Sequence, residues 1–600
     1  MGNMIKVSDF IANFLAEHEY IGKTVFMVSG GGNMHLIDSL GKNSKLEYVC
    51  NHHEQACALA AEGYARTSNK IGISYVTTGP GGTNAITGVY SAWVDSIPTL
   101  TISGQVKFET TIASQPELKL RQLGDQEVNI IDLVKPITKY AVMVTDKNTI
   151  KYHLQKAVYE AKSGRPGPVW LDIPLDIQGA MIEQDDLIEF EIPNTPIHDN
   201  KTVEVINLLK SAKRPVIIAG NGIRLSGANN EFMKLLNKLK VPVVSTFARF
   251  DILNSDSEYY MGRYGTIGNR MANFTVQNAD LVIAIGARMN IRAVSYNWEF
   301  FARDAKKIVV DIDPNELAKH TLKVDLPIVS DAKQFCVKLA KVIDHTSDSW
   351  AWWLDRCKQY KNDFPTIDGW RKDIKGFVDS YNFFDVLSDM TKDDDVFVFG
   401  NATPSVAGYQ SLRLKGRQRV LANSGCAAMG YDLPAAIGAC YANGKNEVMC
   451  FTGDGSIQMN IQELQTIIHN RLPIKIFIFN NQGYISIRNT QNGFFKGNFV
   501  GSSEISGVSC PDMQKIAIAY GFDFIRIENQ DNLADDLRNV LGKNDSLICE
   551  LMIDPCEKME PKLSSEIKPD GKMISKPLED MYPFLDREIF KQNMIIKSME

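Results

Sequence analysis

Two polar side chains directly follow two apolar runs in the last third of the chain. The runs are "EVMCF" (447–451) and "IKIFIF" (474–479), and after them come Asp454, within "GDG", and Asn481, within "NNQG". Short, almost wholly apolar, β-rich runs are typical of strands that are covered on both faces of a parallel sheet. A carboxylate and an amide oxygen are hard donors suited to Mg²⁺, which keeps room for phosphate oxygens. The pattern therefore predicts a magnesium and diphosphate site.

The segment between the two runs predicts the helix that positions these groups. Apolar residues recur at helical spacing from Ile457 to Ile468, and Asn460 with Glu463 has the form of a capping box. A strand–helix–strand unit crosses over right-handed, so we expect two parallel strands whose polar ends meet at one carboxyl edge. Open α/β sheets bind ligands at that edge. For "GDGS" alone the alternative is a tight turn with an Asx cap.

The combination of GDG, an interval of this size and NN resembles the signature of enzymes that depend on thiamine diphosphate. The chain has no complete Gly-x4-Gly-Lys-Ser/Thr P-loop that would offer another phosphate site. The resemblance implies that Asp454, Asn481 and the carbonyl of Gly483 hold Mg²⁺ against the cofactor's diphosphate. The residues of this segment predicted to bind the cofactor are Gly453, Asp454, Gly455, Ser456, Asn481, Gly483 and Tyr484.

A second motif lies in the first third of the chain. The stretch "LEYVCNHHEQACALAAEGYAR" (46–66) predicts a strand followed by a helix, with Glu54 at the start of the helix. A carboxylate stabilised by a helix N-terminus, an effect of up to about 1 kcal/mol, is one interpretation. However, "HEQ" followed by "AAEGYAR" resembles the glutamate segment of the thiamine-diphosphate family. There the glutamate bonds N1′ of the aminopyrimidine and promotes deprotonation of the thiazolium C2, so Glu54 is the predicted catalytic residue.

Two longer runs resemble the acetolactate synthase branch of this family. They are "VTTGPGGTNAITGVYSAWVDSIPTLTISGQV" (76–106) and "NSGCAAMGYDLPAAIGA" (423–439). By this resemblance Met429 props the cofactor into its bent form and the carbonyl of Ala427 accepts from its 4′-amino group, although Met429 as simple core filling is the alternative. The remaining residues predicted to bind the cofactor are Gly31, Gly32, Thr78, Gln115, Asn401, Ala402 and Thr403.

The resemblance covers nearly the whole chain and implies an α/β fold with three doubly wound parallel-sheet domains. We expect a pyrimidine-binding domain at 1–185, a central FAD or nucleotide-type domain at 195–345, a diphosphate- and Mg-binding domain at 370–555, and a tail at 556–600. In the family each active site is shared between two subunits, which implies a homodimer or homotetramer. Glu54 of one chain would then face Asp454 and Asn481 of another.

The central block carries a glycine-rich turn, "AGNGIRLSGA" (219–228). In the synthase branch this domain binds FAD, which has no redox role in the carboligation. The resemblance therefore adds FAD to thiamine diphosphate and Mg²⁺ as an expected cofactor. Arg288 and Arg292, in "GARMNIR", are candidates for contacts with its phosphates or with another nucleotide, and ordinary surface arginines are the alternative.

Composition excludes several other classes of function. A net charge of -6 gives no basic field for nucleic acid or anionic membranes, and 44% hydrophobic with 23% charged residues is typical of a globular protein. None of the ten cysteines forms a CxxC pair, which indicates reduced thiols. The first twenty residues predict an amphipathic helix rather than a signal peptide, and no run of about 18 apolar residues predicts a membrane span. We expect a cytoplasmic protein.

Some segments depart from the synthase pattern. Gly124 and Asp125 replace an Ala-Phe pair near the acceptor pocket, which indicates a wetter pocket or a rearranged loop. Three polar side chains follow the NN pair, and we expect them near the acceptor: Tyr484, Arg488 and Gln491. Three apolar residues in the polar tail suit a lid over the entrance or a subunit contact: Leu578, Met581 and Phe584.

The predicted activity is thiamine-diphosphate-dependent decarboxylation of a 2-keto acid, with pyruvate as the first choice, and transfer of the acyl anion to a carbonyl acceptor. The specific hypothesis for the acceptor is a nucleotide-linked keto-sugar of polysaccharide biosynthesis. Three alternatives stay open: an acetolactate synthase proper, a cyclic diketone hydrolase of the same superfamily, and a non-catalytic binding or regulatory homologue.

Overall fold

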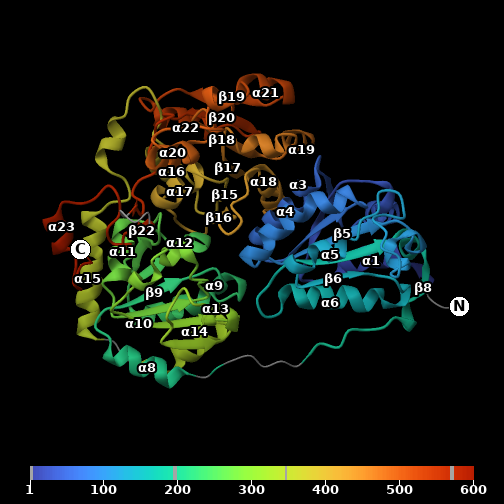
Figure 1. Ribbon diagram of the computed structural model, residues 1–600, viewed down its shortest axis with the longest axis horizontal. Coiled ribbons are helices and arrows are strands. Elements are labelled where there is room, and N and C mark those ends of the chain that lie inside the picture. Colours follow the sequence, from blue (N-terminus) through green and yellow to red (C-terminus); the bar gives the residue numbers. More distant parts are fainter. Residues whose placement is uncertain (1–3, 194–198, 200, 345–346, 568–572, 600) are drawn as a thin grey trace.

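The computed structural model describes residues 4–193, 199, 201–344, 347–567 and 573–599. The chain forms three domains, each built on a six-stranded sheet whose strand pairs are all parallel (Figure 1). Helices flank each sheet, which confirms the predicted fold class. The predicted domain boundaries at 195 and 345 lie outside the described residues.

The three sheets have a similar strand order. In each sheet the first strand in sequence lies inside the sheet, and later strands lie on both sides of it. The orders are β3-β2-β4-β5-β7-β6, β11-β10-β9-β12-β13-β14 and β16-β15-β17-β18-β20-β19. The strands of the first sheet are β2 (Ile21–Met27), β3 (Glu47–Cys50), β4 (Ile71–Val76), β5 (Thr99–Gln105), β6 (Tyr140–Met143) and β7 (Val169–Pro174). Those of the central sheet are β9 (Pro215–Ala219), β10 (Val243–Ser245), β11 (Tyr260–Arg263), β12 (Leu281–Ile285), β13 (Lys306–Asp311) and β14 (Leu326–Val329). Those of the third are β15 (Val396–Phe399), β16 (Arg419–Ala422), β17 (Val448–Gly453), β18 (Ile474–Asn480), β19 (Asp523–Ile527) and β20 (Leu547–Met552).

The helices that concern the site lie at the ends of these strands or between domains. In the first domain they are α1 (Val7–Glu17), α3 (Glu54–Ser68) and α4 (Pro80–Asp95). In the central domain and the connector they are α11 (Arg270–Gln277), α12 (Ile291–Val294), α13 (Pro314–Ala318) and α15 (Asp348–Asp363). In the third domain and tail they are α16 (Ser380–Met390), α17 (Thr403–Ser411), α18 (Asp432–Ala442), α19 (Glu463–His469), α20 (Ile485–Phe495), α21 (Met513–Tyr520) and α23 (Arg587–Gln592).

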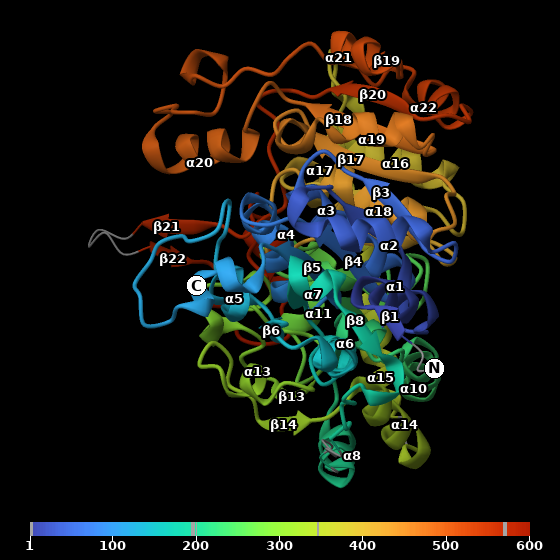
Figure 2. The same cartoon turned by 90° about the vertical axis from the view of Figure 1, so that its right-hand side faces the viewer.

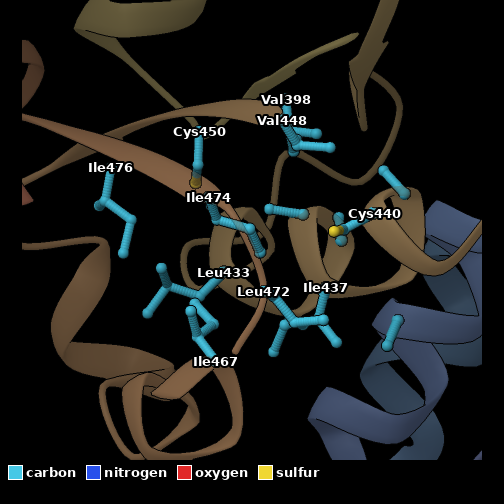
Figure 3. Packing of buried hydrophobic residues seen from close by; sticks show 14 of the residues in the cluster. Val398, Leu433, Ile437, Cys440, Val448, Cys450, Ile467, Leu472, Ile474 and Ile476 are labelled. Atoms are coloured by element: carbon cyan, nitrogen blue, oxygen red, sulfur yellow. The ribbon is translucent and has the colours of Figure 1, made fainter. Parts of the chain in front are cut away.

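The two apolar runs form adjacent central strands of the third sheet. β17 and β18 pair in parallel, with Val448 opposite Ile474 and Gly453 opposite Phe479. Their apolar side chains are buried because α18 and neighbouring helices cover the sheet; Figure 3 shows Leu433 and Ile437 of α18 among the side chains of these strands. This register brings Asp454 and Asn481 to the same carboxyl edge, as the sequence predicts.

Two glycines allow α3 of the first domain to pack closely on α18 of the third. A Cβ at Gly63 would lie 2.3 Å from the carbonyl oxygen of Ala435, and one at Gly438 would lie 1.9 Å from that of Ala60. Only glycine fits at such an approach of two backbones. Figure 2 shows the two helices side by side. The packing holds the helix that begins with Glu54 against the domain that carries Asp454.

The last part of the chain lies on the central domain. Leu578 and Met581 are each 1% exposed, and Asn273 of α11 donates to the carbonyl oxygen of Leu578 at 3.0 Å. Farther along, the side chain of Asn278 donates to the carbonyl oxygen of Asn593 at 2.9 Å. These two apolar side chains are therefore inside the protein and do not form the lid or subunit contact considered from the sequence. Phe584 stays half exposed.

Candidate functional site

Asp454 is the carboxylate at the centre of the candidate site. It follows β17 and is 1% exposed, and its two oxygens accept from the backbone N–H groups of Gly455 and Gly483, each at 2.9 Å. Burial raises the pKa of Asp454 to about 6, and the two backbone donors together with the nearby Arg488 guanidinium counteract that rise. Burial makes the charged form of this carboxylate costly, and a cation bound beside it would stabilise that form. Within the described residues, no group of three or more His, Cys, Asp and Glu side chains is suited to a metal, so a metal bound here would also need amide or carbonyl oxygens as ligands.

Three loops at the carboxyl edge of the third sheet contain strained backbone. Ala402 after β15 has φ 63° and ψ −125°, Ala427 after β16 has φ 54°, and Gln482 after β18 has φ 60°. Non-glycine residues in such conformations cost of order 1–3 kcal/mol each and concentrate at functional sites. The first two loops are joined, because the side chain of Asn401 donates to the carbonyl oxygen of Ala427 at 2.8 Å. The structure thus brings the predicted residues Asn401, Ala402 and Ala427 together.

Arg488 braces the loop that carries Asn481 and Gly483. Its guanidinium donates to the carbonyl oxygens of Asn481 at 2.6 Å and of Ser502 at 2.7 Å. Gln491 is also partnered internally, with Val500 and Ser502. The expectation that Arg488 and Gln491 offer free polar groups to an acceptor is therefore wrong, since α20 directs both side chains to the backbone and side chains of its own loop. The Tyr484 ring packs against Gly455.

A buried aspartate that the sequence reasoning missed supports Ser456. Asp432 is fully buried and accepts from the hydroxyls of Ser456 at 2.7 Å and Thr452 at 2.8 Å. Ser456 in turn accepts from the backbone N–H of Gly430 at 3.0 Å, next to the half-buried Met429. The signal in the sequence was an acidic residue at the start of the otherwise apolar run 431–442.

Glu54 is the first residue of α3 and is half buried. Its carboxylate accepts from the side chain of Asn84 at 3.0 Å. The neighbouring Gln55 accepts from Asn460 of the third domain at 2.9 Å, so the N-terminus of α3 lies at a domain junction.

That junction also explains why the predicted capping box is wrong. Glu463 begins α19 but makes no cap with Asn460; its buried carboxylate accepts from the Asn51 side chain at 2.8 Å and from the His52 backbone at 2.9 Å. The competing partners come from the first domain, about 410 positions away in sequence. Local spacing could not reveal them.

The other predicted residues of the first domain lie after β2, β4 and β5. Gly32 packs on Thr78, whose hydroxyl donates to the carbonyl oxygen of Gly104 at 3.1 Å. Gly31 is different, because in the part of the chain that the structure describes a Cβ there would meet no atom within 4 Å. Gln115 is exposed on the loop that follows β5, and its backbone bonds are within that loop.

This loop is rearranged around a buried glutamate. Glu127 is 5% exposed and accepts from the backbone N–H groups of Ile112, Leu123 and Gly124. Asp125 itself is exposed. Of the two interpretations of Asp125, the structure favours the rearranged loop over an acidic pocket wall.

A cavity of about 420 Å³ lies where the three domains meet. Its lining includes Arg165 of the first domain, Arg288 and Arg292 of the central domain, and Ser424 of the third. Arg288 donates to the carbonyl oxygen of Val94 at 2.8 Å, whereas no ion pair of the described residues involves Arg292. The glycine-rich turn at 219–228 contributes to the same lining. The lining holds four cationic side chains and four carboxylates, so the cavity has room for a ligand such as a nucleotide but no excess of positive charge.

Comparison with known proteins identifies related families and sequences. The chain matches the thiamine pyrophosphate enzyme N-terminal TPP binding domain over residues 5–127, the central domain over 202–339 and the C-terminal TPP binding domain over 399–551. A probable acetolactate synthase large subunit of Methanococcus aeolicus is 32% identical over 578 residues, covering 92% of each chain. The acetolactate synthase large subunit of Lactococcus lactis subsp. lactis is 30% identical over 551 residues, covering 91% of this chain and 92% of the relative. The acetolactate synthase isozyme 2 large subunit of Escherichia coli K12 is 31% identical over 559 residues, covering 93% of this chain and 97% of the relative.

Among the described residues, no helix is both long enough and apolar enough to cross a bilayer.

Proposed function

This chain belongs to the thiamine pyrophosphate enzyme family, and we propose that it decarboxylates pyruvate and joins the remaining two-carbon unit to a carbonyl acceptor. The family and the acetolactate synthase relatives agree with the predicted resemblance and with a carboligase or lyase. The observation that carries the proposal is the buried Asp454 beside three strained loops at one sheet edge.

The residues at this edge fit thiamine pyrophosphate. A Cβ at Gly453 would meet no atom of the described residues within 4 Å, so the backbone there faces open space. The buried hydroxyl oxygen of Thr403, at the start of α17, has no hydrogen-bond partner among the described residues. A diphosphate supplies acceptors for such a hydroxyl and for helix N-terminal N–H groups. Asn401, Ala402, Thr403 and Gly453 would line its path. When bound, the cofactor supplies the carbon centre that takes up the keto acid and accepts the electrons released with CO₂.

Asp454, Asn481 and the carbonyl oxygen of Gly483 would hold Mg²⁺. The donors are one carboxylate, one amide and one carbonyl, which are the hard oxygen ligands that magnesium prefers alongside phosphate. The cation would offset the cost of burying an ionised Asp454. Arg488 fixes the Asn481 loop through backbone carbonyls, and its guanidinium leaves the Asp454 oxygens to the metal.

Glu54 would hold and release the proton at N1′ of the aminopyrimidine. Asn84 orients its carboxylate, and the packing of α3 on α18 fixes the start of the helix. We place this group opposite Asp454 of a second copy in a homodimer or a dimer of dimers, as the resemblance implies.

For the cavity at the domain junction, we assign FAD or a related nucleotide to the lining that contains Arg288 and Arg292. A flavin spectrum of the purified protein tests that assignment.

The test of the activity is cofactor-dependent release of CO₂ from labelled pyruvate. Chain without Mg²⁺ or thiamine pyrophosphate is the control, and no release in the complete mixture would contradict the proposal.

The names of the relatives favour a small keto-acid acceptor, and they give no support to a nucleotide-linked keto-sugar. Pyruvate, 2-ketobutyrate, simple aldehydes and a nucleotide-linked 4-keto-deoxysugar should therefore compete in one assay. A preference of tenfold or more in kcat/KM, about 1.4 kcal/mol, identifies the acceptor.

A further inference from the structure

A buried carboxylate contacts the loops of the candidate cofactor site without being one of the predicted ligands. Asp432, at the start of α18, is 0% exposed, and no ion pair found in the described part of the chain involves it. Its Oδ2 accepts from the hydroxyls of Thr452 at 2.8 Å and Ser456 at 2.7 Å. Its Oδ1 accepts from the backbone N–H of Leu433 at 3.0 Å. The side chain therefore acts as a hydrogen-bond acceptor toward all three neighbours.

The carboxylate of Asp432 lies between two of the loops. A Cβ at Gly400 would lie only 2.3 Å from Oδ2, so the chain that enters the loop after β15 runs directly against this oxygen. Thr452 and Ser456, which donate to the same oxygen, flank the GDG segment 453–455. One buried oxygen thus joins the loop after β15 to both ends of the GDG segment.

Ser456 extends this contact to a third loop. Its Oγ donates to Asp432 and accepts from the backbone N–H of Gly430 at 3.0 Å. A hydroxyl has a single hydrogen, so the bond to Asp432 fixes the rotation of that hydrogen and turns a lone pair toward Gly430. The carbonyl oxygen of Gly430 accepts from the Asn460 side chain at 2.8 Å. Because Gly430 directly follows Met429, these bonds on both sides of its backbone fix the end of the loop after β16.

We infer that Asp432 is a positioning residue that, through Ser456 and Gly430, holds the loop after β16 against the bound cofactor. This loop carries the strained Ala427 and the half-buried Met429 at the carboxyl edge of the sheet. The single hydroxyl hydrogen of Ser456 is engaged with Asp432, so it is not available to a diphosphate. This role rests on the proposed function, because it requires the cofactor to lie against that loop.

The proposed metal ligands lie outside this set of hydrogen bonds. The Asp454 carboxylate accepts from the backbone of Gly455 and Gly483, and no hydrogen bond of the described residues joins Asp432 to Asp454 or Asn481. Loss of Asp432 should therefore leave the metal and diphosphate contacts in place and alter only how the cofactor lies against the loop after β16.

The test compares substitutions in the full-length protein. Asp432→Asn keeps the shape of the side chain but replaces one acceptor oxygen by a donor, so it cannot serve all three neighbours. Ser456→Ala breaks the same link and leaves Asp432 in place, so the test does not depend on the folding of one variant. The matched control is Asp395→Asn, a buried carboxylate of the same domain that precedes β15 and accepts from the backbone N–H of Lys392 at 2.7 Å.

Three quantities are measured: the affinity for thiamine pyrophosphate at saturating Mg²⁺ by calorimetry, the near-ultraviolet circular dichroism of the bound cofactor, and kcat and KM with pyruvate. In Asp432→Asn and Ser456→Ala, we expect cofactor affinity and KM to stay within about threefold and kcat to fall at least about tenfold. The dichroism of the bound cofactor should change in both variants and stay at the wild-type form in Asp395→Asn. The double variant should be no slower than the slower single variant, because both substitutions break one link.

Wild-type kcat and dichroism in folded Asp432→Asn or Ser456→Ala overturn the inference, as does an equal loss in Asp395→Asn. Additive losses in the double variant overturn it too. A fall in cofactor affinity with unchanged kcat would place Ser456 on the diphosphate and contradict the inference. Binding and dichroism are measured without pyruvate, so a changed dichroism supports the role of Asp432 even where the pyruvate assay fails. Absence of thiamine pyrophosphate binding by the wild type would overturn both this role and the proposed function.

Discussion

Replacement of Gly453 by alanine distinguishes a cofactor cradle from an ordinary turn. The new methyl group meets no atom of the described part of the protein within 4 Å, so the fold should tolerate it. Gly→Ala at a compatible position stabilises by about 0.4–1 kcal/mol through the unfolded chain. A diphosphate that passes over this backbone would, however, be displaced by the methyl group. We expect affinity for thiamine pyrophosphate to fall at least about 100-fold, or about 2.7 kcal/mol, with no loss of thermal stability in the metal-free protein.

The assay is calorimetric titration with thiamine pyrophosphate at saturating Mg²⁺, together with the unfolding temperature of the metal-free protein. Gly41→Ala is the matched control, because a Cβ there also meets nothing within 4 Å but lies outside the site. Gly455→Ala is the contrast, because its Cβ would lie 2.3 Å from the Tyr484 ring and should destabilise the protein itself. Wild-type cofactor affinity in Gly453→Ala would refute the reasoning and restore the interpretation of GDG as a capped turn.

Three further predictions concern catalysis, the metal and the tail. Glu54→Gln should leave cofactor affinity within about tenfold but depress turnover strongly, since an amide cannot take up the N1′ proton; full activity would remove Glu54 from the mechanism. With a pKa of about 6, Asp454 is about 91% ionised at pH 7 and about 9% at pH 5, so protonation should weaken metal-dependent cofactor binding about tenfold over this interval. Calorimetry at both pH values, corrected for protonation of the free cofactor, checks this, and an unchanged affinity would contradict it. Leu578→Ala should cost about 2–5 kcal/mol and lower the unfolding temperature, while Phe584→Ala, at an exposed position, should stay within about 0.5 kcal/mol.

The sequence predicted the parts of the site that depend on local pattern. The almost wholly apolar runs 447–451 and 474–479 predicted central strands, and parallel neighbours bring Asp454 and Asn481 to one edge. Contacts between distant segments decided the rest. Glu463 has the spacing of a cap, yet partners in the first domain take its carboxylate. From the sequence we expected the Arg488 side chain to face an acceptor. In the structure it donates instead to four backbone carbonyl oxygens.

The docking of residues 578–593 on α11 and α15 has a consequence for synthesis of the chain. The strands of the central domain are complete by residue 329, but Asn278 and Tyr360 receive their partner, the carbonyl oxygen of Asn593, only after that later segment has been synthesised. Roughly 250 residues separate the two events, which at about 5–20 residues per second takes about 12–50 s. During that interval the ribosome displays a folded α/β unit with an uncovered apolar face. A chaperone that binds this face would be needed most strongly in this window, and its release should coincide with emergence of the tail.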